Sequence, residues 1–246
     1  MSIALGAMLS SCGRTNHAEE LEKQIKNMGG ASAELGSVEY TISKIIAVDH
    51  DVFYKIGERK VLFSSLSTMK AGVDLEYFVP TNQLDGYKDL WDTELRVDIL
   101  VRKGNEFCPV ELKFKTKKIK TSLTRFGVDI ADVVIVKDQG AQDLGMYGFW
   151  KDVKRIEMVK ARFETVKSGL SVFLTNDVAY MKPTRENSNN KEFTMCEGLN
   201  SSSKHWQRET KISLAHQGFD LSRDYLVEWN ESKFGEHTFH YCIVEV

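Results

Sequence analysis

Residues 95–102 read Leu-Arg-Val-Asp-Ile-Leu-Val-Arg, and residues 108–114 read Cys-Pro-Val-Glu-Leu-Lys-Phe. Both runs alternate apolar and polar residues with a period of two, which is typical of β-strands. Lys103, Gly104 and Asn105 lie between them and favour a tight turn. The stretch therefore predicts an antiparallel hairpin, and a turn centred on Gly104 and Asn105 fixes its register.

That register places two acidic residues opposite each other. Asp98 faces Glu111 with Cβ atoms about 4.5–5.5 Å apart, where two carboxylates repel unless a cation lies between them. Lys113 follows Glu111 by two residues and shares its face. The apolar residues that alternate with these point the other way and predict a core: Val97, Ile99, Val101, Val110, Leu112 and Phe114.

Two acids and an amine on one face of a hairpin suit metal-assisted chemistry. Mg²⁺ is bound through one or two carboxylates, and it leaves coordination positions for water and a substrate phosphate. A lysine beside the ion orients the attacking water and offsets charge that builds up on the phosphate.

The pattern Asp98 followed by Glu111-Leu112-Lys113 resembles the PD-(D/E)XK, or restriction-endonuclease-like, nuclease superfamily, whose signature is an Asp at the end of one strand and Glu-x-Lys on the next. The resemblance spans roughly residues 90–180, and Val97 stands where the family name has proline. It implies an α/β fold with a mixed central sheet flanked by helices. It also implies that Asp98, Glu111 and the Leu112 carbonyl bind Mg²⁺, with Mn²⁺ as a substitute, and that Lys113 positions the water.

A structural alternative explains the same residues. Glu111, Lys113 and Lys115 could form the solvated face of an ordinary hairpin and keep an edge strand soluble. Three features favour the metal site instead: the carboxylates fall in register, a basic run follows at once, and a long amphipathic helix comes next, as the superfamily order requires. A further metal ligand would be an acidic residue ahead of the Asp98 strand, but none of the candidates there stands out: Glu58, Glu76 and Glu94.

Further candidate residues follow the hairpin. Lys115, Lys117, Lys118 and Lys120 form a basic run that suits a phosphodiester backbone, with a plain solvated surface as the alternative. The net charge of −2 offers no global attraction to nucleic acid, so DNA binding must rest on such a local cluster. Gln142 is a fourth catalytic candidate, for a phosphate or water contact, with helix capping as its alternative.

The rest of the chain predicts further elements. A helix from Ala141 packs apolar residues such as Leu144, Tyr147 and Trp150, with Lys151, Asp152, Lys154 and Arg155 on other faces, and the Tyr147 hydroxyl is expected to reach the surface. Residues 133–136 are expected as a buried strand or extended segment, and residues 171–177 as a strand. Residues 183–204 are expected as a long surface loop, and residues 239–246 as a strand that closes the sheet at one edge. We divide the chain into a helical or mixed segment, 1–75, and a nuclease domain, 76–246, or treat it as one continuous domain.

Composition fits an ordinary soluble protein, with 42% hydrophobic and 28% charged residues among 246. The four scattered cysteines suggest a reducing compartment, and we expect a cytoplasmic protein without a membrane span. As an alternative, Leu9-Ser10-Ser11-Cys12 resembles a bacterial lipoprotein cleavage box, which would anchor the chain through Cys12, although residues 1–11 contain no Lys or Arg.

The sequence thus predicts a Mg²⁺-dependent DNA phosphodiester hydrolase, an endonuclease that serves restriction, phage defence or repair. One alternative is a restriction-endonuclease-like module that binds nucleic acid or protein without cutting. Another is a surface lipoprotein of unrelated function. DNA is the expected partner, and the sequence leaves open whether the protein acts as a monomer or a homodimer.

Overall fold

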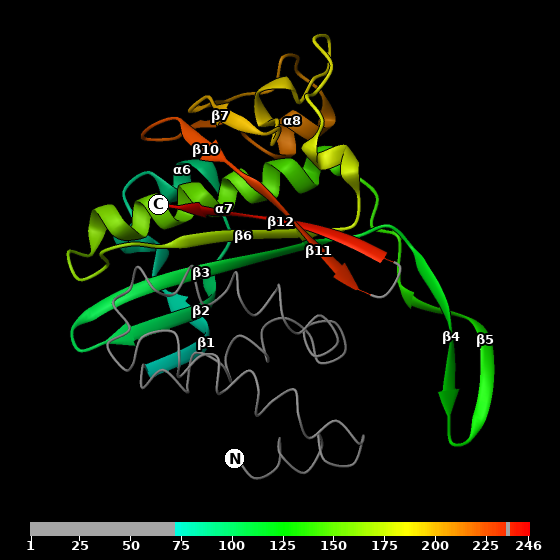
Figure 1. Ribbon diagram of the computed structural model, residues 1–246. Coiled ribbons are helices and arrows are strands. Elements are labelled where there is room, and N and C mark those ends of the chain that lie inside the picture. The colour runs from blue at the N-terminus through cyan, green and yellow to red at the C-terminus, as the bar shows by residue number, and fades with distance from the viewer. Residues whose placement is uncertain (1–71, 235–236) are drawn as a thin grey trace.

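The computed structural model describes residues 72–234 and 237–246 (Figure 1). The sequence-based predictions for residues 1–71, including the Cys12 anchor, fall outside the described part. The described elements, in chain order, are β1 (Gly72–Val79), η1 (Thr81–Gln83), α6 (Tyr87–Leu90), β2 (Leu95–Lys103), β3 (Glu106–Lys115), β4 (Ile119–Arg125), β5 (Val128–Val136), α7 (Gln142–Arg162), β6 (Leu170–Thr175), η2 (Val178–Met181), η3 (Lys191–Phe193), β7 (Gly198–Asn200), β8 (Ser203–Lys204), α8 (Lys211–Ala215), β9 (Phe219–Asp220), β10 (Tyr225–Val227), β11 (Trp229–Phe234) and β12 (His237–Glu245).

A six-stranded mixed sheet organises these elements, in the order β1-β2-β3-β6-β12-β11. Every neighbouring pair is antiparallel except β3 and β6, which run parallel. A parallel pair needs a long crossover, and the chain supplies it through β4, β5 and α7. The expected α/β class with a mixed central sheet is confirmed. The proposed division at residue 75 lies within β1.

The hairpin of β2 and β3 has the predicted register. Lys103 pairs with Glu106 across the turn, where Gly104 has a φ of 60°, and the pairing continues to Ile99 and Val110. One step further, the same register puts Asp98 opposite Glu111. There a side chain joins the two strands, because the Asp98 Oδ2 atom accepts a hydrogen bond of 2.7 Å from the Leu112 amide.

Helix α7 covers one face of the sheet, as predicted. It lies between the sheet and the C-terminal segments, by which we mean the chain from η3 to β10 (Figure 1). Its aromatic side chains Phe149 and Trp150 are fully buried, and Phe149 contacts Phe173 of β6 edge to face. The predicted surface position of the Tyr147 hydroxyl is wrong, since this group accepts a buried hydrogen bond of 2.9 Å from Trp91 Nε1.

Strands β4 and β5 leave the main sheet and form a separate two-stranded arm that projects from the molecule (Figure 1). The strand predicted at residues 133–136 exists within β5, but its predicted burial is wrong for most of its length. Val136 is buried at the base of the arm, whereas Val134 is 45% exposed. The physical reason is that β5 pairs only with β4 and has no layer over it among the described residues.

Residues 183–204 do not form the predicted surface loop. Phe193, Met195 and Lys204 are fully buried, and the segment includes η3, β7 and β8. The Trp150 Nε1 group explains the packing, because it donates to the carbonyls of Phe193 and Thr194 at 3.1 and 3.0 Å. The segment has a polar composition, so its sequence did not indicate these contacts to α7.

The C-terminal strand is also placed differently from the prediction. β12 does not close the sheet, because it pairs with β6 on one side and with β11 on the other. The edge strand is β11, whose sequence Trp-Asn-Glu-Ser-Lys-Phe is too polar for apolar periodicity to reveal. A strand between two others must be apolar on both faces or well paired, and β12 meets this with buried Phe239, Tyr241 and Val244.

Candidate functional site

The structure brings Asp98, Glu111 and Lys113 together beneath α7. Asp98 lies on β2, and Glu111 and Lys113 lie on β3, which is a central strand of the sheet. Asp98 is 8% exposed and Glu111 is 5% exposed. The solvated-face alternative is therefore wrong, because it required an exposed edge strand.

Helix α7 adds an acid that was absent from the sequence-based prediction of the site. The Lys113 Nζ atom lies 2.8 Å from Asp152 Oδ2, and Asp152 is 3% exposed. Arg155, one turn further along, places its Nη1 atom 3.7 Å from Asp152 Oδ1. Gly148 faces the aliphatic end of Lys113, where an added Cβ would stand 3.5 Å from Cε. The helix therefore approaches β3 closely and encloses the lysine.

The electrostatics of Glu111 are those of a buried acid among acids. Burial raises the pKa of Glu111 well above its ordinary value of 4.5, and the neighbouring carboxylates of Asp152 and Asp98 raise it further. The Glu111 Oε1 atom is buried and has no hydrogen-bond partner among the described residues. Buried polar atoms are normally paired, so this oxygen is a place for a proton or a cation.

Lys113 behaves differently. Burial alone would lower the pKa of its amine, but Asp152, by charge and hydrogen bond, together with Glu111 and Asp98, raises this pKa above 10.5. The amine is therefore an ammonium ion at neutral pH. A lysine in this state stabilises negative charge and does not accept a proton.

The donor set fits a hard divalent cation. Asp98 and Glu111 offer carboxylate oxygens, and Leu112 is joined to the Asp98 carboxylate through its amide. Within residues 72–234 and 237–246, no group of three or more Asp, Glu, His or Cys side chains has the geometry of a metal site. Two carboxylates with a carbonyl and water are nevertheless a set that Mg²⁺ accepts. The orphaned Glu111 Oε1 atom is the observation that agrees with such an ion.

Gln142 is held elsewhere. Its Nε2 atom donates to Asp177 Oδ2 at 2.5 Å, and the other oxygen of that carboxylate lies 3.0 Å from Lys117 Nζ. Asp177 also caps η2 through Ala179. The described contacts of Gln142 thus tie the start of α7 to the end of β6, and they do not reach Asp98 or Glu111.

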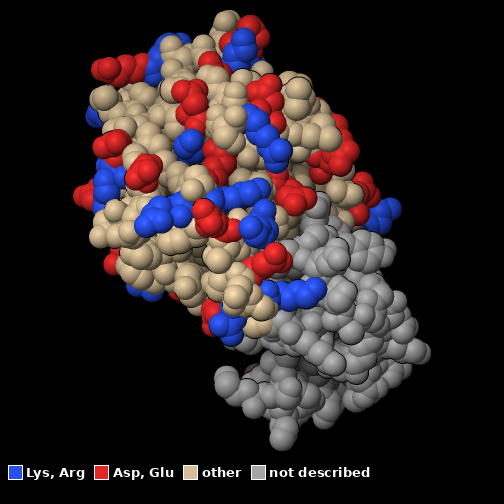
Figure 2. All heavy atoms as spheres, turned by 90° about the vertical axis from the view of Figure 1, so that its left-hand side faces the viewer, with Lys and Arg blue, Asp and Glu red and all other residues tan. Residues whose placement is uncertain are grey.

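The basic run extends from the end of β3 into the arm. Lys115 ends β3, Lys117 and Lys118 form the connection, and Lys120 lies on β4, with its Nζ atom 3.8 Å from Asp132 Oδ1. Lys117 and Lys120 thus already have acidic neighbours. On the face turned toward the viewer in Figure 2, basic and acidic side chains are intermingled over the described part of the surface.

Sequence reasoning did not include Asp152 and Arg155 in the site, because it placed them only away from the apolar face of the helix. A signal was present, since Gly148 and Asp152 are four residues apart and share one side of the helix. A glycine on that side marks the place where the helix approaches β3.

Comparison with protein-family models, with curated proteins and with solved structures returned no match for this chain. No helix in the described residues has both the length and the apolar character that crossing a membrane requires.

Proposed function

We propose that this protein is a Mg²⁺-dependent phosphodiester hydrolase acting on DNA, of the PD-(D/E)XK type. The observation that carries the proposal is the buried cluster of Asp98, Glu111 and Lys113, in which a carboxylate oxygen of Glu111 lacks a partner among the described residues. The order of a hairpin, a long helix and a strand parallel to β3 agrees with the core order of that superfamily.

Asp98, Glu111 and the Leu112 carbonyl would hold the ion. Mg²⁺, when bound, lowers the pKa of a coordinated water and withdraws charge from a phosphate oxygen. The protein prepares the site in two ways. Glu111 releases its proton from the carboxyl group when a cation offsets the charges of Asp152 and Asp98. Helix α7 covers the cluster and limits its access to bulk water, which strengthens every charge interaction inside.

Lys113 contributes a fixed positive charge. Its ammonium group offsets the negative charge that develops on the phosphate during attack. Asp152 acts as a positioning residue, because the 2.8 Å ion pair orients the Lys113 amine and keeps it protonated. The sequence-based role of Lys113, positioning of the attacking water, is compatible with a charged amine as a hydrogen-bond donor.

The direct test is incubation of the purified protein with supercoiled, linear and single-stranded DNA in Mg²⁺ and in chelator. The proposal is supported if the wild-type protein cleaves DNA in Mg²⁺ but not in chelator, and if Lys113→Met does not cleave it. Lys167→Met serves as the control for a contaminating nuclease, since Lys167 is exposed and follows α7. Cleavage that survives Lys113→Met, or no cleavage of any of the three substrates, contradicts it.

A second candidate is a module of the same fold that binds nucleic acid or a partner without cutting. The close Lys113–Asp152 ion pair favours it, because a lysine engaged by a buried carboxylate has fewer free donors for a substrate. The same incubation separates the two: binding to DNA without cleavage in Mg²⁺ or Mn²⁺ identifies the module.

A further inference from the structure

The arm of β4 and β5 is firmly anchored at its base. The Asn176 side chain bonds the main chain of Lys117 twice, accepting from its amide at 2.7 Å and donating to its carbonyl at 3.1 Å. Thr116 Oγ1 donates to the Lys137 carbonyl at 2.8 Å, which joins the two ends of the arm. The base is thus fixed to Asn176, directly after β6, while the far end projects from the molecule (Figure 1).

The tip of the arm holds an aromatic residue in a conformation that disfavours it. Phe126 and Gly127 connect the strands with φ values of 53° and 78°. Two successive positive φ values are typical of a type I′ turn, for which Asn-Gly is the preferred pair, and a bulky residue in this region is an outlier. Phe126 is fully exposed, so packing does not compensate for the strain. Strained, exposed residues of this kind are candidates for function.

The arm also combines apolar and basic side chains. Val128, Ile130 and Val134 of β5 are 61%, 44% and 45% exposed. Residues 117–137 carry a net charge of +3, from Lys117, Lys118, Lys120, Arg125 and Lys137 against Asp129 and Asp132, whereas the whole chain carries −2. The arm is therefore net positive in a chain that is net negative, which suits a polyanion.

We propose that the arm is a DNA-binding ribbon that lies in a groove of the duplex, and that Phe126 inserts as a wedge against the bases. A two-stranded ribbon has the width that a groove admits, and apolar wedges at base steps are an established way to bend a duplex. This inference rests on the DNA specificity of the proposed function. In this proposal Phe126 inserts as the wedge, and Lys118 and Arg125 contact the flanking phosphates.

A second copy of this chain is the competing occupant of the apolar strand β5. Two arms of net charge +3 would repel each other, so the charge favours DNA. Self-association would change the oligomeric state of the protein, which gives it a signature separate from DNA binding.

The test uses the full chain in chelator, where the proposed chemistry is inactive, with a duplex that contains 2-aminopurine as a reporter of unstacking. Phe126→Asn should weaken binding about tenfold or more, because stacking of one aromatic side chain on a base contributes that much. It should also abolish the fluorescence increase. The melting temperature should not fall, since Asn suits the turn better than Phe.

Two variants and a measurement of oligomeric state complete the design. Phe126→Trp should keep affinity and the fluorescence increase. Leu199→Asn is the matched control, because Leu199 is 72% exposed on β7, outside the arm. Equal affinity of wild type and Phe126→Asn overturns the proposal, and so does a dimer that Phe126→Asn dissociates without a change in DNA affinity.

The outcomes also separate this proposal from the proposed function. If wild type cleaves DNA in Mg²⁺ and Phe126→Asn binds DNA as tightly as wild type, the wedge proposal is overturned and the hydrolase proposal stands. If the fluorescence increase depends on Phe126 but no DNA is cleaved in Mg²⁺, the ribbon proposal stands and the hydrolase proposal is overturned. A wild-type chain that binds no duplex overturns the ribbon, whereas the hydrolase is overturned only if none of the three DNA substrates is cleaved.

Discussion

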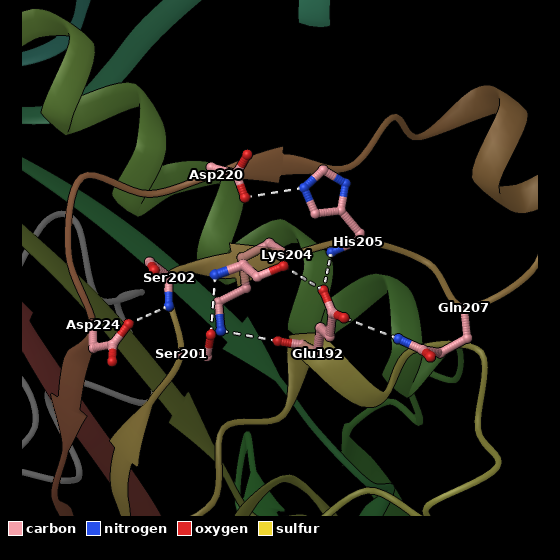
Figure 3. Close-up of polar contacts among 9 residues, drawn as sticks. Glu192, Ser201, Ser202, Lys204, His205, Gln207, Asp220 and Asp224 are labelled. Atoms are coloured by element: carbon pink, nitrogen blue, oxygen red, sulfur yellow. Dashed lines mark hydrogen bonds and ion pairs between the residues drawn. The ribbon is translucent and has the colours of Figure 1, made fainter.

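Two lysines contact α7 from opposite sides and differ in their surroundings. Lys113 approaches from the sheet and meets the Asp152 carboxylate at 2.8 Å. Lys204 approaches from the C-terminal segments, is fully buried, and lies with its Nζ atom 3.9 Å from the centroid of the Trp150 ring. Its hydrogen bond of 2.9 Å goes to the main-chain carbonyl of Glu192 (Figure 3).

The nearest carboxylate to Lys204 is engaged elsewhere. Glu192 accepts hydrogen bonds from Ser203 Oγ, the His205 amide and Gln207 Nε2. Burial therefore lowers the pKa of Lys204 to about 7, against weaker opposing effects of Glu192 and Asp224. In Lys113 the carboxylates overcome burial and raise the pKa. The charge of a buried lysine therefore depends more on its carboxylate partners than on its burial.

Removing each lysine in turn separates the roles of Lys113 and Lys204. Lys113→Met should reduce DNA cleavage by about 10²-fold or more, since it removes charge at the transition state. Lys204→Met should leave the rate per folded molecule unchanged, because within the described residues its amine contacts the Glu192 carbonyl and the Trp150 ring, away from Asp98, Glu111 and Lys113. Single-turnover cleavage rates, normalised to the folded fraction by circular dichroism, measure both. Equal losses in the two variants would show that Lys113 acts only through the fold.

Metal binding tests the acids around Lys113. Mg²⁺ or Mn²⁺ should raise the melting temperature of the wild-type protein, because a ligand at 100 times its Kd stabilises the folded state by about 2.7 kcal/mol. Asp98→Ala should abolish the increase. Thermal melts in metal and in chelator measure the difference, with Asp220→Ala, an exposed acid beside His205, as control. The assignment fails if Asp98→Ala and wild type shift by the same amount.

The sequence predicted the part of the site that lies within one hairpin. Strand periodicity and the turn at Gly104 fixed the 98–111 pairing, because both are local properties of the chain. It did not place Asp152 at the site, because which polar face of a helix meets the sheet depends on the crossover between β3 and β6, and the spacing of Gly148 and Asp152 was the one local sign of it. Lys204 was hidden for the same reason, since its burial depends on Trp150, more than fifty residues earlier.

The predictions for β5 and β12 show a further limit. Both segments were correctly expected as strands, but one was expected to be buried and the other to lie at an edge. β5 is exposed because it is one of the two strands of the arm, and β12 is internal because the polar strand β11 pairs with it. Apolar content identifies a strand, whereas its neighbours in the sheet are set by long-range pairing that a single sequence does not encode visibly.

A third group of lysines lies outside the core and is expected to bind DNA phosphates. Replacing Lys115, Lys117, Lys118 and Lys120 with Ser should lower the slope of log K against log salt by about 0.9 for each duplex phosphate that the variant no longer neutralises. We expect Lys118 to contribute most, since Lys117 and Lys120 already face Asp177 and Asp132. Binding isotherms at several salt concentrations measure the slope. Wild-type affinity and slope in the quadruple variant would make the run a solvated surface.

The smallest expected effect concerns the stability contributed by Lys204. Its folded-state pKa of about 7 lies below the ordinary value of 10.5, so the unfolded chain binds more protons between these pH values. The free energy of unfolding should therefore rise with pH in this window, and the stability should be lost as pH falls toward 7. We expect a rise of about 2 kcal/mol between pH 7 and 9 in wild type relative to Lys204→Met. Urea titrations at pH 7, 8 and 9 measure it, with Lys167→Met as the exposed control. Parallel pH profiles for wild type and Lys204→Met would mean that Lys204 is charged in the fold, and that the contrast with Lys113 lies in geometry and not in protonation.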